Sequence, residues 1–166
     1  EDTHASLEAA VELAHMSGCR LAVARYPEAP VFRARLHLPT REQVPVLVVD
    51  DNEDVLQLLR RYAAGSRYRL ITTREPEQIY ALVEQNHPFA IILDIMMPKE
   101  NGWMVLGRLK QVPQTRQIPV IICTILPQEK LALTLGAASF LKKPVTRQAF
   151  LQMLDQVLAQ QESEPA

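Results

Sequence analysis

The chain has 166 residues, of which 48% are hydrophobic and 22% charged, with a formal net charge of −1. This is the composition of a globular protein with a real core, long enough for one domain and a substantial appendage. The near-zero charge gives no overall case for nucleic-acid binding, the longest apolar runs are too short to cross a bilayer, and no basic-then-apolar leader opens the chain, so we expect a cytoplasmic protein.

The first predicted elements, in residues 1–39, form an extension before the main domain. They are a helix at 6–16, a strand at 20–25, a turn at 26–30 and a strand at 31–38. Apolar residues at three- and four-residue spacing predict the helix, and Gly18 predicts its end. Alternation of apolar with other residues on both sides of a proline-rich turn predicts a β-hairpin. Residues 40–44 are then a short linker.

From residue 45 onward, short apolar runs alternate with amphipathic stretches. The predicted strands cover 46–49, 68–72, 89–93, 119–123 and 139–142. The predicted helices cover 53–64, 77–85, 102–111, 128–135 and 147–160. Pro76 fits the first turn of the second helix, Gly136 ends the fourth in a left-handed conformation, and Thr146 caps the fifth.

Five strands that are each followed by a helix predict an α/β fold, with a parallel sheet covered by helices on both faces. Such sheets bind ligands beyond the carboxyl ends of their strands. The functional residues should therefore follow the strands directly.

Polar residues do stand at these ends. Asp50 and Asp51 follow the first strand, Asp94 the third, Thr124 the fourth and Lys143 the fifth. Carboxylates a few ångströms apart repel one another and need a cation, and Mg²⁺ is the hard cation that carboxylates bind alongside phosphoryl oxygens. Each acid alone could instead cap a helix or lie in a turn, and Lys143 alone could be a surface lysine. Their order at successive strand ends favours a joint site.

Four parts of the sequence together resemble the receiver domains of two-component response regulators. They are residues 46–51, residues 92–98 with Gly102, Thr124, and Lys143 with Pro144. The resemblance covers about residues 45–160 and leaves 161–166 as a tail. It implies a flavodoxin-like, doubly wound sheet with strand order 2-1-3-4-5.

The same resemblance implies the chemistry. Asp94 would take a phosphoryl group from a sensor histidine kinase or a histidine phosphotransfer protein. Asp51, Asp94 and the main-chain carbonyl of Met96 would coordinate Mg²⁺, with Asp50 acting largely through water. Such a domain is a phosphoacceptor and not a conventional enzyme.

Three further residues receive roles from the resemblance. Thr124 would bond to the transferred phosphoryl group and Lys143 would pair with it, while Phe140 would be the aromatic residue that moves when Thr124 does. The Lys143–Pro144 bond would be cis.

Two features depart from the family pattern. Ile125 stands where a small residue is usual, and we hypothesise that it slows hydrolysis of the acyl phosphate. The fourth helix is about one turn short. The fourth helix, fifth strand and fifth helix form the usual partner or homodimer surface, so the short helix weakens any inference about that surface.

Two alternatives remain open at this stage. The extension, with Leu38-Pro39 at its end, resembles the C-terminal end of a histidine kinase ATP-binding domain without its ATP-binding motifs, so the chain could be the receiver part of a hybrid sensor kinase. His4 lacks the surroundings of a phosphorylated histidine.

A phosphatase with an aspartate nucleophile is disfavoured, because Met96 stands where such enzymes carry a second acid. The expected partners include neither nucleic acid nor a membrane.

Overall fold

A computed structural model of the chain describes residues 9–14, 16, 20–25, 32–37, 43–98 and 100–163. The chain divides into two compact units, Glu1–Glu42 and Gln43–Ala166. The predicted turn at 26–30, the stop at Gly18 and residues 40–42 of the predicted linker lie outside the described residues.

The first unit contains a helix, described at residues 9–14 and 16, and two antiparallel strands. Strand β1 (Arg20–Arg25) pairs with β2 (Phe32–His37), so that Leu21 lies opposite Leu36 and Val23 opposite Ala34. The described part of the predicted helix and the antiparallel pairing of the two predicted strands are therefore present.

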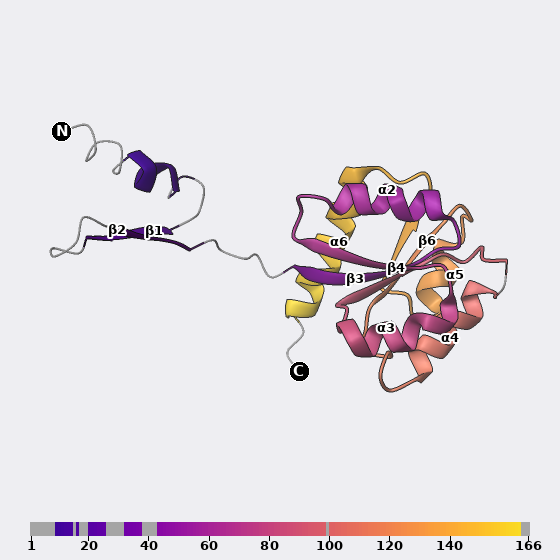
Figure 1. Cartoon of the computed structure of the whole chain (residues 1–166). Helices are drawn as coiled ribbons and strands as arrows, with labels where there is room; N and C mark the ends of the chain where they lie inside the picture. The colour runs from indigo at the N-terminus through magenta and orange to yellow at the C-terminus, as the bar shows by residue number, and fades with distance from the viewer. Residues whose placement is uncertain are drawn as a thin grey trace. The chain divides into compact units, whose positions relative to one another are not determined.

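The second unit is built on a five-stranded parallel sheet (Figure 1). Its strands are β3 (Val44–Val49), β4 (Tyr68–Thr73), β5 (Ala90–Leu93), β6 (Val120–Thr124) and β7 (Ser139–Lys142). They lie in the order β4-β3-β5-β6-β7. Counted within this sheet, that is the order 2-1-3-4-5, which confirms the flavodoxin-like fold predicted from the sequence.

Helices connect successive strands. They are α2 (Glu53–Ala63), a 3₁₀ turn η1 (Pro76–Gln78) that leads into α3 (Ile79–Asn86), α4 (Gly102–Gln111), α5 (Glu129–Thr134) and α6 (Arg147–Ser163). Two helix boundaries differ from the prediction by more than one residue. The second helix opens with a tighter turn, in which the N–H of Gln78 donates to the carbonyl of Glu75 at 3.1 Å. The last helix continues past residue 160, and its final hydroxyl, on Ser163, donates to the carbonyl of Ala159.

Successive strand residues point to opposite faces of the sheet, and each face is covered by helices. Val46 and Val48 pack with Leu56 of α2 and Phe150 of α6. The residue between them, Leu47, packs on the other face with buried side chains of α3 and α4. Figure 1 shows the same layers, with α2 and α6 on one side of the sheet and α3 and α4 on the other.

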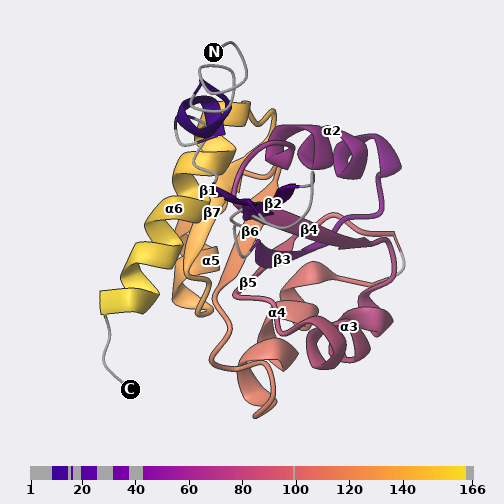
Figure 2. The ribbon, with the colours of Figure 1, turned by 60° about the vertical axis from the view of Figure 1, so that its left-hand side comes forward.

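Helix α6 runs from the carboxyl end of the sheet back to its amino end. Thr146 caps its start, because the N–H of Ala149 donates to Thr146 Oγ1 at 3.2 Å. Its last turn borders a recess together with Pro119 and Ala138, which directly precede β6 and β7. Figure 2 shows α6 beside β7, the edge strand that it follows. No helix among the described residues is both long enough and apolar enough to cross a membrane.

Candidate functional site

The predicted site residues meet at one end of the parallel sheet. Asp50 follows β3, Asp94 follows β5, Thr124 ends β6 and Lys143 follows β7. Main-chain hydrogen bonds hold these strand ends in register: the N–H of Asp94 donates to Val49 and that of Lys143 donates to Thr124, both at 2.9 Å. The convergence expected of a parallel sheet is therefore present.

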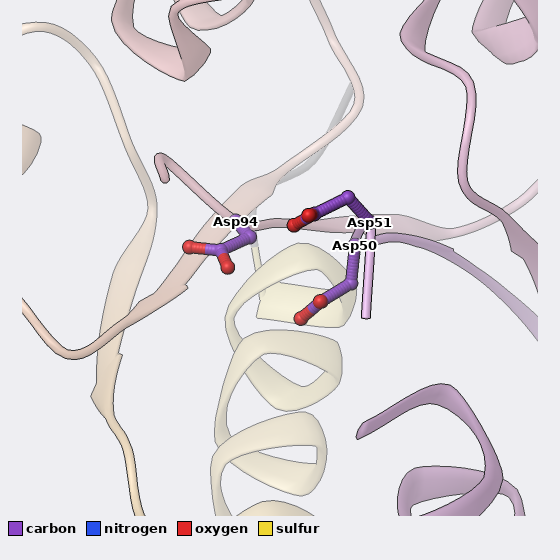
Figure 3. A group of neighbouring side chains, drawn as sticks. All are labelled: Asp50, Asp51 and Asp94. Carbon is purple, nitrogen blue, oxygen red and sulfur yellow. The ribbon is translucent and has the colours of Figure 1, made fainter. Parts of the chain in front are cut away.

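Three carboxylates form the centre of the site (Figure 3). Asp50, Asp51 and Asp94 each offer an oxygen, and these oxygens all lie within 4.8 Å of one another. Asp50 is 2% exposed and Asp94 6%, while Asp51 is half-buried. Three acids so close together, two of them buried, require positive charge nearby.

Lys143 supplies part of that charge. Its Nζ donates to Asp50 Oδ2 and to Asp94 Oδ2, both at 2.7 Å. Main-chain donors hold the remaining oxygens, since the N–H of Asn52 donates to Asp50 Oδ1 and the N–H of Met96 donates to Asp94 Oδ1. Two of the three carboxylates are thus fixed on both oxygens.

The pKa values follow from this burial and charge. Burial raises the pKa of Asp50 above its ordinary value of 3.8, although the hydrogen bond and charge of Lys143 act to lower it. Burial alone would lower the pKa of Lys143, but its two carboxylate partners outweigh burial and raise it. Lys143 is therefore firmly protonated at neutral pH, while the ionised form of Asp50 is disfavoured unless more positive charge is present.

Thr124 ends β6, and Phe140 lies on β7, the strand that Lys143 directly follows. Thr124 is fully buried, and its Oγ1 accepts a hydrogen bond from the N–H of Leu126 at 3.4 Å. Phe140 is half-buried on β7 opposite Ile122 and packs against the core beneath α3 and α4. The Lys143–Pro144 bond is cis, as predicted.

A glycine brings α4 against the residue after β5. A Cβ on Gly102 would lie 2.5 Å from the main-chain oxygen of Asp94 and 2.5 Å from Cα of Ile95. The N–H of Gly102 donates to the carbonyl of Ile95 at 3.2 Å, and the side chain of Asn101 caps the helix by accepting from the N–H of Trp103. The backbone of Asp94 is thereby held by a contact that only glycine allows.

Sequence reasoning missed two residues of the site. Asn52 caps α2 through its side chain and also donates its N–H to Asp50. Arg74, directly after β4, donates from Nε to the main-chain oxygen of Asp51 at 2.8 Å. The rule that placed the acids at strand ends points to Thr73 when it is applied to the predicted strand 68–72, and it reaches Arg74 only because β4 extends to Thr73.

The oxygen donors fit a hard divalent cation. Carboxylate oxygens are what Mg²⁺ prefers, and the site has one half-buried carboxylate, Asp51, that lacks a hydrogen bond to its side chain among the described residues. Three negative charges against Lys143 within the cluster and the exposed Arg74 at its edge still leave an excess of negative charge, which a divalent cation would offset.

Comparison with known proteins agrees with this geometry. The family model of the response regulator receiver domain matches residues 46–155. The chain belongs to this family. It therefore carries a receiver domain, the phosphoacceptor module of two-component signalling, and receiver domains interact with histidine kinases or phosphotransfer proteins.

Curated relatives cover the same region. Response regulator PleD of Caulobacter vibrioides is 36% identical over 103 residues, which are 60% of this chain and 23% of PleD. Response regulator SaeR of Staphylococcus aureus is 32% identical over 116 residues, which are 68% of this chain and 50% of SaeR. The chain thus spans 23% of the length of one of these relatives and 50% of the other.

Solved structures have the same fold. A putative response regulator from Chloroflexus aurantiacus superposes with a TM-score of 0.65 at 25% identity, covering 70% of this chain and 98% of that one. The signal receiver domain of a signal transduction histidine kinase from Syntrophus aciditrophicus gives a TM-score of 0.64 at 25% identity, covering 74% and 95%.

Proposed function

We propose that Asp94 accepts a phosphoryl group from a phosphohistidine of a sensor kinase or phosphotransfer protein. The observation that carries this proposal is the pair of 2.7 Å hydrogen bonds from Lys143 to Asp50 and Asp94 inside a three-carboxylate cluster. In the transfer, one oxygen of Asp94 attacks phosphorus, the P–N bond breaks, and the imidazole of the donor keeps the electron pair.

The residues of this chain would position and neutralise the groups that react. Asp51, Asp94 and the carbonyl of Met96 would hold Mg²⁺, with Asp50 acting through water. When bound, the ion offsets negative charge on the phosphoryl oxygens. Lys143 would exchange its bond to Asp94 for one to the phosphoryl group, which keeps the lysine paired throughout.

The output would be a population shift within the sheet. Thr124 presents a hydroxyl at the end of β6, where it would bond to the arriving phosphoryl group. Phe140, half-buried on the neighbouring strand, would move into the space that Thr124 leaves. The surface that reports this change would comprise α5, β7 and α6, through which two copies of the chain would pair; the exposed Leu131, Leu133 and Leu135 support this choice.

The test is phosphorylation by a small phosphodonor. The protein is incubated with acetyl phosphate and Mg²⁺, and its intact mass is measured. We expect one phosphoryl group on the wild type and on Asp54→Asn, which removes an exposed acid near the site, and none on Asp94→Asn. An unmodified wild type, or an undiminished adduct on Asp94→Asn, would overturn the proposal. Release of phosphate from small phosphoesters would instead indicate a phosphatase.

A second candidate function is that of the receiver part of a hybrid sensor kinase. It is favoured by the separate helix and antiparallel hairpin before the receiver, which have the element order of the end of a kinase ATP-binding domain. The sequence encoded directly upstream of Glu1 tests it. A Gly-x-Gly motif within a few tens of residues supports the hybrid kinase, and an unrelated sequence there contradicts it.

A further inference from the structure

Arg74 is a charged residue at the carboxyl end of the sheet to which the proposed chemistry gives no role. It directly follows β4, the edge strand that pairs with β3. Its exposed side chain reaches the neighbouring strand end, where Nε donates to the main-chain oxygen of Asp51 at 2.8 Å. A residue from the edge strand thus holds the backbone of one acid of the cluster.

The three acids are held in unequal ways. The carboxylates of Asp50 and Asp94 each accept one main-chain N–H and the Nζ of Lys143. Within the part of the chain that the structure describes, Asp51 makes a single hydrogen bond, the one from Arg74 to its carbonyl. The position of the Asp51 carboxylate therefore depends on where Arg74 holds its backbone.

A cavity beside Asp51 makes the hydrogen bond from Arg74 important for the position of Asp51. The cavity, of about 160 Å³, is lined by Asp51, by Arg74, Glu75 and Pro76 from the segment after β4, and by Met97 and Pro98 from the loop after Asp94. This is several times the volume of one water molecule, roughly 30 Å³ in the liquid. Without the hydrogen bond from Arg74, Asp51 has room in this cavity to change its position relative to the other two acids.

We propose that Arg74 is a positioning residue for Mg²⁺ binding, which it favours by fixing Asp51 relative to Asp50 and Asp94. Mg²⁺ demands near-octahedral geometry, so ligands that are already in place bind it more tightly. The inference rests on the proposed function, because it requires this cluster to be the Mg²⁺ site.

The charge of Arg74 opposes this effect, since a guanidinium beside the cluster repels a second cation. Two neutral variants separate the two contributions. In Arg74→Gln, the amide nitrogen follows Cδ as Nε does in arginine, so the donor is kept while the charge is lost. Arg74→Met has a similar length and the same loss of charge but no donor.

The experiment measures Mg²⁺ dissociation constants by calorimetry and by fluorescence of Trp103, the single tryptophan, which lies in the first turn of α4 next to Gly102. We expect Arg74→Met to bind Mg²⁺ roughly 10-fold more weakly than Arg74→Gln, at the low end of the effect of groups that hold metal ligands in place. Arg69→Met removes an exposed arginine from the other end of β4, opposite Pro45, and should leave the constant unchanged. Arg74→Leu provides a second donor-free variant if Arg74→Met unfolds.

A double-mutant cycle tests whether Arg74 acts through Asp51. In an Asp51→Asn background, the difference between Arg74→Met and Arg74→Gln should disappear. Equal Mg²⁺ affinities of these two variants in the wild-type background would overturn the inference while leaving the proposed function intact. A wild type that binds no Mg²⁺ would overturn both.

Discussion

Two glycines in the same helix should respond oppositely to alanine. Gly107 lies in the middle of α4, and a Cβ added there meets no atom within 4 Å. Alanine restricts the unfolded chain and favours helix, so Gly107→Ala should raise the free energy of unfolding by about 0.5–1 kcal/mol. Helix propensity alone predicts the same sign for Gly102→Ala.

The packing around Gly102 reverses that sign. The added Cβ would lie 2.5 Å from two main-chain atoms, of Asp94 and Ile95. That is about 0.9 Å short of ordinary contact, and main-chain atoms cannot rotate away. Overpacking of this kind costs about 1–3 kcal/mol, which exceeds the roughly 1 kcal/mol gained from helix propensity. Two contacts of 2.5 Å with main-chain atoms place the cost near the upper end of that range, so we expect a net loss of about 2 kcal/mol of stability.

The displaced atoms include the backbone of Asp94, the proposed phosphoacceptor, so we expect phosphorylation to be affected more than stability. A misplacement of about 1 Å can cost on the order of 100-fold in rate. Urea unfolding gives the free energies, and the initial rate of mass gain from acetyl phosphate gives the chemistry, with Gly107→Ala as the matched control. If Gly102→Ala unfolds and phosphorylates like the wild type, the close approach of α4 to Asp94 does not govern the site.

Three other predictions concern the lifetime of the acyl phosphate, two backbone positions with positive φ, and the charge of Asp50. Ile125 is 58% exposed beside the site, and Ile125→Ala should shorten the life of the acyl phosphate several-fold; an unchanged dephosphorylation rate rules this out. His87 ends α3 with φ at 45°, so His87→Gly should stabilise the protein by about 1 kcal/mol, whereas Gly136→Ala, at φ 91°, should destabilise it by a similar amount, both read from urea unfolding. Burial raises the pKa of Asp50, so the protonated carboxyl stabilises the folded state. This contribution is complete below pH 3.8 and is lost as the pH rises through the raised pKa. Asp50→Asn should therefore be more stable than the wild type at pH 7 without divalent cations, and a less stable variant would contradict this.

The fold could be predicted from the sequence because its signals were local and consistent. Runs such as 46–49 and 89–93 are apolar without alternation, which is what strands buried on both faces require. The boundaries of the helices were less predictable. Nothing local distinguishes the 3₁₀ turn Pro76–Gln78 from ordinary helix, and the polar residues after 160 gave no reason to extend α6 to Ser163.

The candidate site was predictable as a set of residues but not as a network. A parallel sheet brings all its carboxyl ends together, so the acids, Thr124 and Lys143 had to be neighbours. That Lys143 bridges Asp50 and Asp94, and that Arg74 holds Asp51, depends on side-chain directions that no spacing encodes. The role of Gly102 likewise became clear only from the 2.5 Å approach to Asp94.

The path of α6 determines how this domain can be joined to other polypeptide. Its last turn lies near the amino ends of β6 and β7, and β3, where the chain enters the sheet, also begins at the amino end. Both covalent connections of the receiver therefore lie at the pole opposite to Asp94, separated from it by about 20 Å of strand. A domain fused or exchanged at either connection would therefore be attached at the end of the sheet away from Asp94.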